Sequence, residues 1–146
     1  MNVDRTPRNP NLLLVGGHET TVNLIGNGLF ALLRHPDQLE LLRTDESVEK
    51  TAIEELLRFD SPVQYTGRVA RADFELRGRQ IHAGDGVRMI LGAANRDPEV
   101  FGDPNRLDLR RAPCPHLAFG AGIHHCHGAP LARLEGRIAL TMLIRR

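Results

Sequence analysis

The sequence FGAGIHHCHG at positions 119–128, which continues into APLARLE at positions 129–135, decides how the rest of the chain is interpreted. Three glycines in this stretch allow backbone angles that are closed to other residues and let the main chain approach a bulky ligand. Pro130 suits the first turn of a helix. The pattern therefore predicts a glycine-rich loop that brings Cys126 to the start of a helix.

The residues after this loop repeat at helical spacing. Four apolar residues recur on one predicted helical face: Leu131, Leu134, Ile138 and Met142. We therefore expect Cys126 to lie just ahead of a buried helix. A helix N-terminus offers unpaired N–H groups and the positive end of the helix dipole, and both favour a thiolate over a thiol. Cys126 is thus a candidate metal ligand or nucleophile, whereas an isolated buried cysteine is more often an inert small hydrophobe.

The pattern Phe-Gly-x-Gly-x-His-x-Cys-x-Gly at positions 119–128 resembles the haem-binding loop of the cytochrome P450 family. It fixes six residue identities, so a chance match is improbable. The resemblance implies that Cys126 is the proximal thiolate ligand of the iron in haem b, which pushes electron density toward O–O cleavage. It also implies that Phe119 packs near the cysteine, that His124 hydrogen-bonds a haem propionate, and that Gly128 belongs to the cofactor-binding loop.

A second motif, GGHETT at positions 16–21, lies inside the apolar run 12–33. Paired glycines weaken a helix and the Thr20 hydroxyl can bond a backbone carbonyl, so we expect a local kink or widened turn. The alternative is a buried helix with an incidental polar spot. Beside the cysteine loop, the segment resembles the distal helix of the same family. That resemblance implies that Gly17 makes room for dioxygen and that Glu19 and Thr20 deliver protons to it.

A third motif pairs Glu55 with Arg58, whose side chains can face each other on a helix because they are three residues apart. An exposed pair of this kind is worth less than about 1 kcal/mol. In the family that the chain resembles, Glu-x-x-Arg meets a second arginine from a later loop, and the segment 104–107 resembles that partner. The resemblance implies a buried triad of Glu55, Arg58 and Arg106 that fixes the loop beneath the haem, so that removing one charge leaves the others unpaired.

The remaining patterns predict a mainly α chain with a small β component, which by resemblance is a partial cytochrome P450 fold. Residues 1–10 read as an irregular lead-in and residues 11–146 as the haem-binding part. Helices are expected at 11–35, 36–43 and 47–59, short strands at 74–76, 79–81 and 87–91, and an irregular connection at 93–115. Ser47 is the expected N-cap of its helix. In the family, an arginine at the position of Arg68 pairs with a haem propionate; otherwise Arg68 is a solvated side chain.

Composition excludes several classes of function. The chain has 146 residues, enough for one domain with a modest core, and its formal net charge of +1 gives no electrostatic reason to bind nucleic acid. Polar side chains within residues 12–33 make a membrane span costly. Because nothing resembling a secretory signal precedes the two cysteines, we expect no membrane association and a reduced, cytoplasmic setting.

The resemblance implies a monooxygenase that activates dioxygen and inserts one oxygen atom into a small organic substrate. A ferredoxin-type donor would supply the electrons. Arg133 and Arg137 on the predicted last helix are candidates for a basic docking surface, or they are ordinary solvated charges.

Two other interpretations remain. One is a zinc-binding structural module, because Cys114, His116 and residues 124–127 crowd into a short segment. Their spacing does not match the paired ligands of zinc sites. The other is a truncated, catalytically inactive P450 remnant. Chains of the family carry a longer region before the distal helix, so we expect a C-terminal fragment that alone binds haem poorly and lacks efficient turnover.

Overall fold

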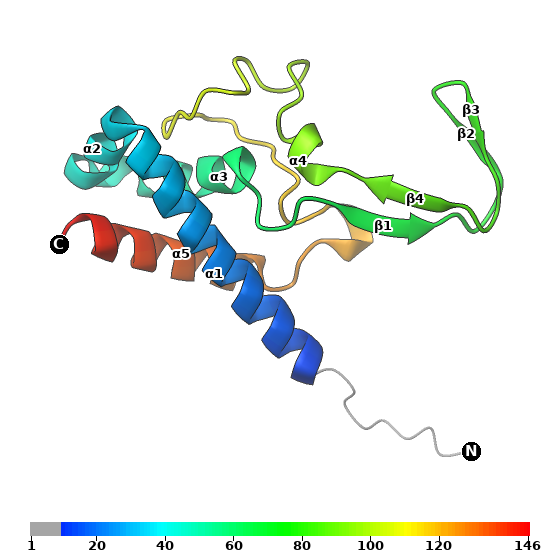
Figure 1. Ribbon diagram of the computed structural model, residues 1–146, viewed down its shortest axis with the longest axis horizontal. Coiled ribbons are helices and arrows are strands. Elements are labelled where there is room, and N and C mark those ends of the chain that lie inside the picture. The colour runs from blue at the N-terminus through cyan, green and yellow to red at the C-terminus, as the bar shows by residue number, and fades with distance from the viewer. Residues whose placement is uncertain (1–9) are drawn as a thin grey trace.

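The computed structural model describes residues 10–146, with side chains from residue 14 onward. The helices are α1 (Pro10–Arg34), α2 (Pro36–Thr44), α3 (Glu49–Phe59), α4 (Leu91–Ala94) and α5 (Ala129–Ile144), with 3-10 turns η1 (Glu46–Val48) and η2 (Gly122–His124). The strands are β1 (Thr66–Val69), β2 (Phe74–Leu76), β3 (Arg79–Ile81) and β4 (Gly86–Met89). Figure 1 shows α1 crossing α5, with the strands projecting on the opposite side from α2. The fold is mainly α with a small β component, as predicted.

Helices α1, α3 and α5 pack around one hydrophobic core, to which Leu24, Ile53 and Leu140 belong. The crossing of α1 and α5 depends on a residue without a side chain. A Cβ atom added at Gly136 would lie 2.7 Å from Cδ2 of Leu24, which is too close for two carbon atoms. Gly136 therefore allows the two helices to approach each other.

The buried face of α5 differs from the predicted one. The four residues predicted to be buried are 45% to 58% exposed: Leu131, Leu134, Ile138 and Met142. The buried residues of this helix are Ala129, Gly136 and Leu140. The prediction of the buried face of α5 is therefore wrong. The neighbouring helices pack where α5 has small residues, and the spacing of its apolar residues does not show which side of the helix they cover.

Helix α1 is α-helical over its whole described length, so the widened turn expected within residues 16–21 does not form there. The Thr20 hydroxyl donates to the Gly16 carbonyl at 2.5 Å, as expected for a threonine inside a helix. Pro10 is the first residue of the helix, and residues 1–9 of the expected lead-in lie outside the described part of the chain.

The predicted helices 36–43 and 47–59 correspond to α2 and to η1 with α3. Ser47 is not the N-cap of this segment. Asp45 holds that position, and its side chain accepts a hydrogen bond from the Ser47 N–H at 2.9 Å. A carboxylate placed two residues earlier satisfies the free N–H, so the helical segment begins before Ser47.

The strands form two antiparallel ribbons, in which β1 pairs with β4 and β2 pairs with β3. The turn between β2 and β3 contains Arg77 and Gly78, with φ angles of 49° and 77°. Two consecutive positive φ angles are typical of a tight hairpin turn. The three predicted strands are present, whereas β1 was not predicted as a separate strand.

The connection from α4 to the cysteine loop is irregular, as predicted, but it belongs to the core. Leu107 and Leu109 are buried with the helices. The Leu109 N–H donates to Oε1 of the buried Gln38 on α2 at 3.0 Å, which pairs a backbone group that would otherwise be buried alone. Within the described residues, no helix has the length and apolar character needed to cross a membrane.

Candidate functional site

Cys126 lies on an exposed loop between η2 and α5. Its N–H donates to the Phe119 carbonyl at 3.0 Å, and its carbonyl accepts from the Ala129 N–H at 3.3 Å. Gly120 and Gly122 have φ angles of 69° and 65°, in the region that favours glycine. The sequence thus folds into the expected glycine-rich loop, which holds Cys126 at the surface directly before α5.

Helix α5 starts directly after Cys126. Gly128 is the N-cap of the helix and Pro130 lies in its first turn, so the positive end of the helix dipole is two to three residues from Cys126. A Cβ atom at Gly128 would lie 3.8 Å from the sulfur of Cys126, which places Gly128 beside the sulfur. Position 128 therefore borders any ligand that the sulfur binds.

The two free cysteines lie in opposite environments. Cys114 is half-buried, and burial together with the negative charge of Glu55 raises the pKa of its thiol to about 12. Cys126 is exposed, so it is the thiol available for metal binding or chemistry.

The residues expected on the oxygen side of the cofactor lie on α1. Gly17 and Glu19 are exposed, and Thr20 is partly buried. A Cβ atom at Gly17 would contact nothing within 4 Å. Gly17 also lines an open cleft of about 540 Å³ between α1 and α5, together with Leu14 and Ile138. Space is available at this position, and the roles of these residues toward dioxygen stay predictions.

The two side chains expected to bind haem propionates, Arg68 and His124, are exposed. The Nη1 of Arg68 donates to Oγ1 of Thr66 at 3.0 Å and to the Gly67 carbonyl at 2.7 Å, so its guanidinium folds back along β1. His124 ends η2, two residues before Cys126. Both side chains are accessible to an anion, and their pairing with propionates stays a prediction.

Glu55 and Arg58 form a buried ion pair on α3. The Arg58 Nε lies 2.7 Å from Oε2 and its Nη2 lies 2.8 Å from Oε1, and neither side chain is exposed to solvent. Such a two-pronged arginine–carboxylate contact is stronger than a single hydrogen bond. The spacing of Glu55 and Arg58 in the sequence therefore produces a core contact and not a surface pair.

The second arginine of this cluster is Arg111, not Arg106 as predicted. The Arg111 Nε lies 3.0 Å from Oε2 of Glu55. Arg106 is exposed, and only its carbonyl takes part, accepting from Nη2 of Arg58 at 3.2 Å and from Nη2 of Arg111 at 3.4 Å. The prediction failed because the backbone of Arg106, and not its side chain, faces the ion pair. We call Glu55, Arg58 and Arg111 the Glu55 network.

The Glu55 network fixes the irregular connection that precedes the cysteine loop. Arg58 donates through Nη1 to the carbonyls of Asn95 and Pro104 at 2.9 and 2.8 Å. Arg111 donates to the carbonyls of Gly102 and Asp103. No buried side-chain nitrogen or oxygen of the described residues lacks a hydrogen-bond partner, so the buried polar groups of the network are satisfied.

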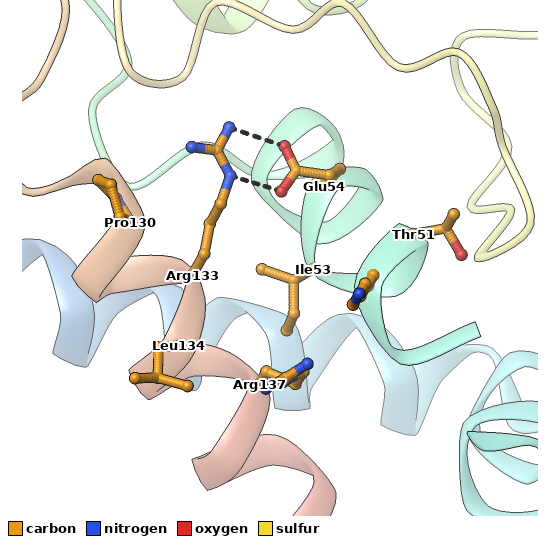
Figure 2. A pocket seen from close by; sticks show the side chains of 8 residues that line it. Thr51, Ile53, Glu54, Pro130, Arg133, Leu134 and Arg137 are labelled. Atoms are coloured by element: carbon orange, nitrogen blue, oxygen red, sulfur yellow. Dashed lines mark hydrogen bonds and ion pairs between the residues drawn. The ribbon is translucent and has the colours of Figure 1, made fainter. Parts of the chain in front are cut away.

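Glu54, the neighbour of Glu55, binds a second set of side chains. Arg133 of α5 reaches it through Nε and Nη2, at 2.6 Å from Oε1 and 2.9 Å from Oε2, as Figure 2 shows. The Nε2 of His116 lies 3.0 Å from Oε2. Burial favours the neutral form of Glu54, but hydrogen bonds from His116 and Arg133 outweigh it and hold the pKa at about 2. Arg133 is therefore bound to Glu54 and is not a free docking charge.

Asn95 is a further structural residue that the sequence did not reveal. It is fully buried, accepts from the Leu117 N–H at 2.7 Å through Oδ1, and donates to the Ser61 hydroxyl at 2.8 Å through Nδ2. An asparagine in a Pro- and Asp-rich segment is typical of an exposed turn. Only the structure shows that this amide anchors the chain ahead of Phe119.

The donor set fits a haem better than a zinc ion. Among the described residues, no group of three or more His, Cys, Asp or Glu side chains is placed to hold a metal ion, so the zinc module has no support there. Iron in a haem needs only one protein thiolate, because the macrocycle itself supplies four nitrogen ligands. One exposed thiol in a glycine-rich loop, with exposed hydrogen-bond donors at Arg68 and His124, meets that requirement.

A pocket of about 390 Å³ lies between α3 and α5 (Figure 2). Its walls include Ile53, Leu134 and Arg137 together with the paired Glu54 and Arg133. None of its lining residues belongs to the cysteine loop. This pocket is therefore not the site of the chemistry.

The exposed Cys126 ahead of α5 offers a single thiol to a ligand, and no multi-ligand metal group occurs among the described residues. Comparison with known proteins identifies the family of the chain. The sequence profile of the family "Cytochrome P450" matches residues 47–146. This match covers more than half of the chain, and the chain therefore belongs to the cytochrome P450 family.

Curated relatives agree with this assignment. The chain is 51% identical to the biotin biosynthesis cytochrome P450 of Bacillus subtilis (strain 168), over 92% of this chain and 34% of that protein. It is 55% identical to the cytochrome P450 monooxygenase PikC of Streptomyces venezuelae, over 92% of this chain and 33% of that protein. The chain thus spans about a third of the length of these relatives.

Solved structures show the same partial match. The crystal structure of P450BioI in complex with hexadec-9Z-enoic acid ligated acyl carrier protein superposes with a TM-score of 0.90 at 51% identity. The superposition covers 92% of this chain and 35% of that one. The fold is accordingly a partial cytochrome P450 fold.

Proposed function

We propose that the chain forms the thiolate side of a haem monooxygenase, in which Cys126 binds the iron of haem b. The observation that carries this proposal is the exposed Cys126 in its glycine-rich loop directly before α5. Bound haem supplies the reductive activation of dioxygen and the insertion of one oxygen atom into an organic substrate. The protein positions the cofactor and tunes its reactivity.

The other residues of the loop and of β1 would hold the macrocycle. His124 and Arg68 are exposed, and their N–H groups can donate hydrogen bonds to the two propionates. Phe119 is half-buried and Gly128 borders the sulfur, so both would pack against the cofactor beside Cys126. The expected functions of these residues are thus orientation and charge compensation.

On the oxygen side, Gly17 leaves space and the polar side chains of Glu19 and Thr20 would move protons. The Thr20 hydroxyl donates a hydrogen bond to the Gly16 carbonyl in this structure. To pass a proton toward dioxygen, this hydroxyl must leave the carbonyl and exchange with Glu19 or with water. The neighbouring carboxyl of Glu19 provides the proton acceptor and donor for that exchange.

The chain spans about a third of the length of its relatives, so its substrate and electron donor are proposed at the level of the family. We propose a small organic substrate, and a ferredoxin-type protein as the electron donor. The relatives' names point to different pathways, and one solved relative is bound to an acyl carrier protein. The proposal therefore stops at the class of substrate.

Haem uptake and the absorption spectrum of the reduced carbon monoxide complex test this function. The measurement uses the 146-residue chain and a chimera in which it replaces the matching C-terminal third of PikC. We expect a thiolate-type spectrum that Cys126→Ser abolishes and Cys114→Ser preserves. A thiolate-type spectrum that survives Cys126→Ser, or a chimera that takes up no haem, contradicts the proposal. Oxygen-dependent product formation by the isolated chain would contradict the expectation that it alone lacks efficient turnover.

A further inference from the structure

Glu54, Arg133 and His116, which we call the Glu54 clamp, join three separate parts of the chain. Glu54 lies on α3, Arg133 lies on α5 seven residues after Cys126, and His116 lies ten residues before it. The two oxygens of Glu54 accept three hydrogen bonds between 2.6 and 3.0 Å. The clamp therefore links both ends of the cysteine loop to one carboxylate.

The hydrogen bonds around His116 fix its tautomer. The Ala118 N–H donates to Nδ1 of His116 at 3.2 Å, so this ring nitrogen carries a lone pair. The proton of the neutral ring is then on Nε2, which donates it to Oε2 of Glu54. His116 is only 2% exposed, which shields this hydrogen bond from water. The imidazole thus connects the backbone at Ala118 to α3.

The clamp continues into the cysteine loop through Phe119. The guanidinium carbon of Arg133 lies 4.6 Å from the centre of the Phe119 ring, a distance at which a cation and an aromatic face attract each other. The Phe119 carbonyl accepts the hydrogen bond from the Cys126 N–H. Arg133 and His116 therefore hold the residue on which the backbone of Cys126 rests.

We infer that Glu54, Arg133 and His116 are positioning residues that fix the Cys126 sulfur for iron binding. This inference rests on the proposed role of Cys126 as the haem ligand, but its structural part concerns the haem-free chain. A carboxylate held by two rigid partners leaves little freedom to the segment 116–119. Loss of the clamp frees Phe119 and with it the backbone of Cys126.

Amide hydrogen exchange at Cys126 tests the inference on the haem-free 146-residue chain. In Glu54→Gln, we expect exchange at Cys126 to be about tenfold faster than in the unmodified chain, because local opening becomes easier. The matched control is Glu49→Gln, which breaks an ion pair of similar exposure between α3 and Arg145, the residue directly after α5, with Arg145 Nη1 at 2.7 Å from Oε1 of Glu49. This control should change exchange at Cys126 less than about twofold.

A second pair of variants separates positioning from a general loss of packing. His116→Gln keeps an N–H donor for Glu54, whereas His116→Ala removes it. We expect the glutamine variant to restore most of the protection at Cys126 that the alanine variant loses. Equal exchange in the two His116 variants, or equal exchange in Glu54→Gln and Glu49→Gln, overturns the inference. Because no haem is present, either result is independent of whether Cys126 binds iron.

Discussion

Two adjacent residues on α3, Glu54 and Glu55, each bind an arginine through both carboxylate oxygens, but the two ion pairs differ in their exposure to solvent. The side chain of Glu55 is fully buried with Arg58, whereas that of Glu54 is 28% exposed and that of Arg133 is 37% exposed. Water can replace a lost partner at Glu54 and cannot do so at Glu55. We therefore assign stability of the fold to the Glu55 network and local positioning of the cysteine loop to the Glu54 clamp.

The largest effect is expected from Arg58→Ala. All five of the hydrogen bonds that Arg58 donates are lost, and the buried carboxylate of Glu55 keeps only the contacts with Arg111 and the Asp108 N–H as strong hydrogen bonds. The free energy of unfolding should fall by about 3 to 5 kcal/mol. Urea denaturation measures this change, and Arg43→Ala at an exposed pair with Glu40 is the control, with an effect within about 0.5 kcal/mol. A loss below about 1 kcal/mol for Arg58→Ala would show that the buried pair is not essential to the fold.

The two cysteines provide the next largest contrast. Because the pKa of Cys114 is raised to about 12, only about one in 10,000 of its side chains is a thiolate at pH 8. We expect iodoacetamide to modify the exposed Cys126 about 100-fold faster than Cys114 in the folded chain. Mass spectrometry of the alkylated peptides gives both rates. If Cys114 and Cys126 were alkylated at comparable rates in the folded chain as well as in the denatured chain, the buried environment of Cys114 would be contradicted.

Arg111→Ala and Arg106→Ala test the structure against the pattern that predicted Arg106. Arg111 is mostly buried on Glu55, so its removal should lower the free energy of unfolding by about 2 kcal/mol. Arg106 is exposed and contributes only its carbonyl, which alanine retains, so its change should stay within about 0.5 kcal/mol. Chemical denaturation of both variants decides the assignment. A larger loss of stability in Arg106→Ala than in Arg111→Ala would make Arg106, and not Arg111, the third member of the Glu55 network.

The smallest effect is the pH dependence of the Glu54 clamp. The pKa of Glu54 is depressed from 4.5 to about 2 in the folded chain, so its stabilising contribution is present above pH 4.5 and is lost as the pH falls toward 2. We expect the stability difference between the unmodified chain and Glu54→Gln to shrink by about 1 kcal/mol between pH 6 and pH 3, after allowance for solvent screening. Thermal denaturation at several pH values measures it. A stability difference that stays constant with pH would mean that Arg133 and His116 do not lower the pKa of Glu54.

The sequence predicted those features that depend on neighbouring residues. Each of these features is encoded within a few consecutive positions: the pairing of Glu55 with Arg58, the glycine-rich loop before Cys126, and the short strands. Local geometry alone brings such residues together. These parts of the fold and of the candidate site follow from the residues themselves.

The predictions that were wrong concern contacts between distant segments of the chain. Arg106 and Arg111 lie in the same arginine-rich connection, and only the path of the backbone decides which side chain turns toward Glu55. The buried side of α5 is set by Gly136, where α1 approaches, and not by its larger apolar residues. The Glu54 clamp spans α3, α5 and the segment before Phe119, so no local pattern indicates it.

X-ray absorption at the iron edge tests the central claim most directly, because it detects the atom bound to the metal. The measurement compares the haem-loaded chimera carrying Cys126 with its Cys126→Ser and Cys114→Ser variants. We predict one sulfur ligand at the iron, which disappears in Cys126→Ser and remains in Cys114→Ser. A sulfur ligand that persists in Cys126→Ser, or an iron without sulfur in the unmodified chimera, would contradict the assignment of Cys126 as the haem ligand.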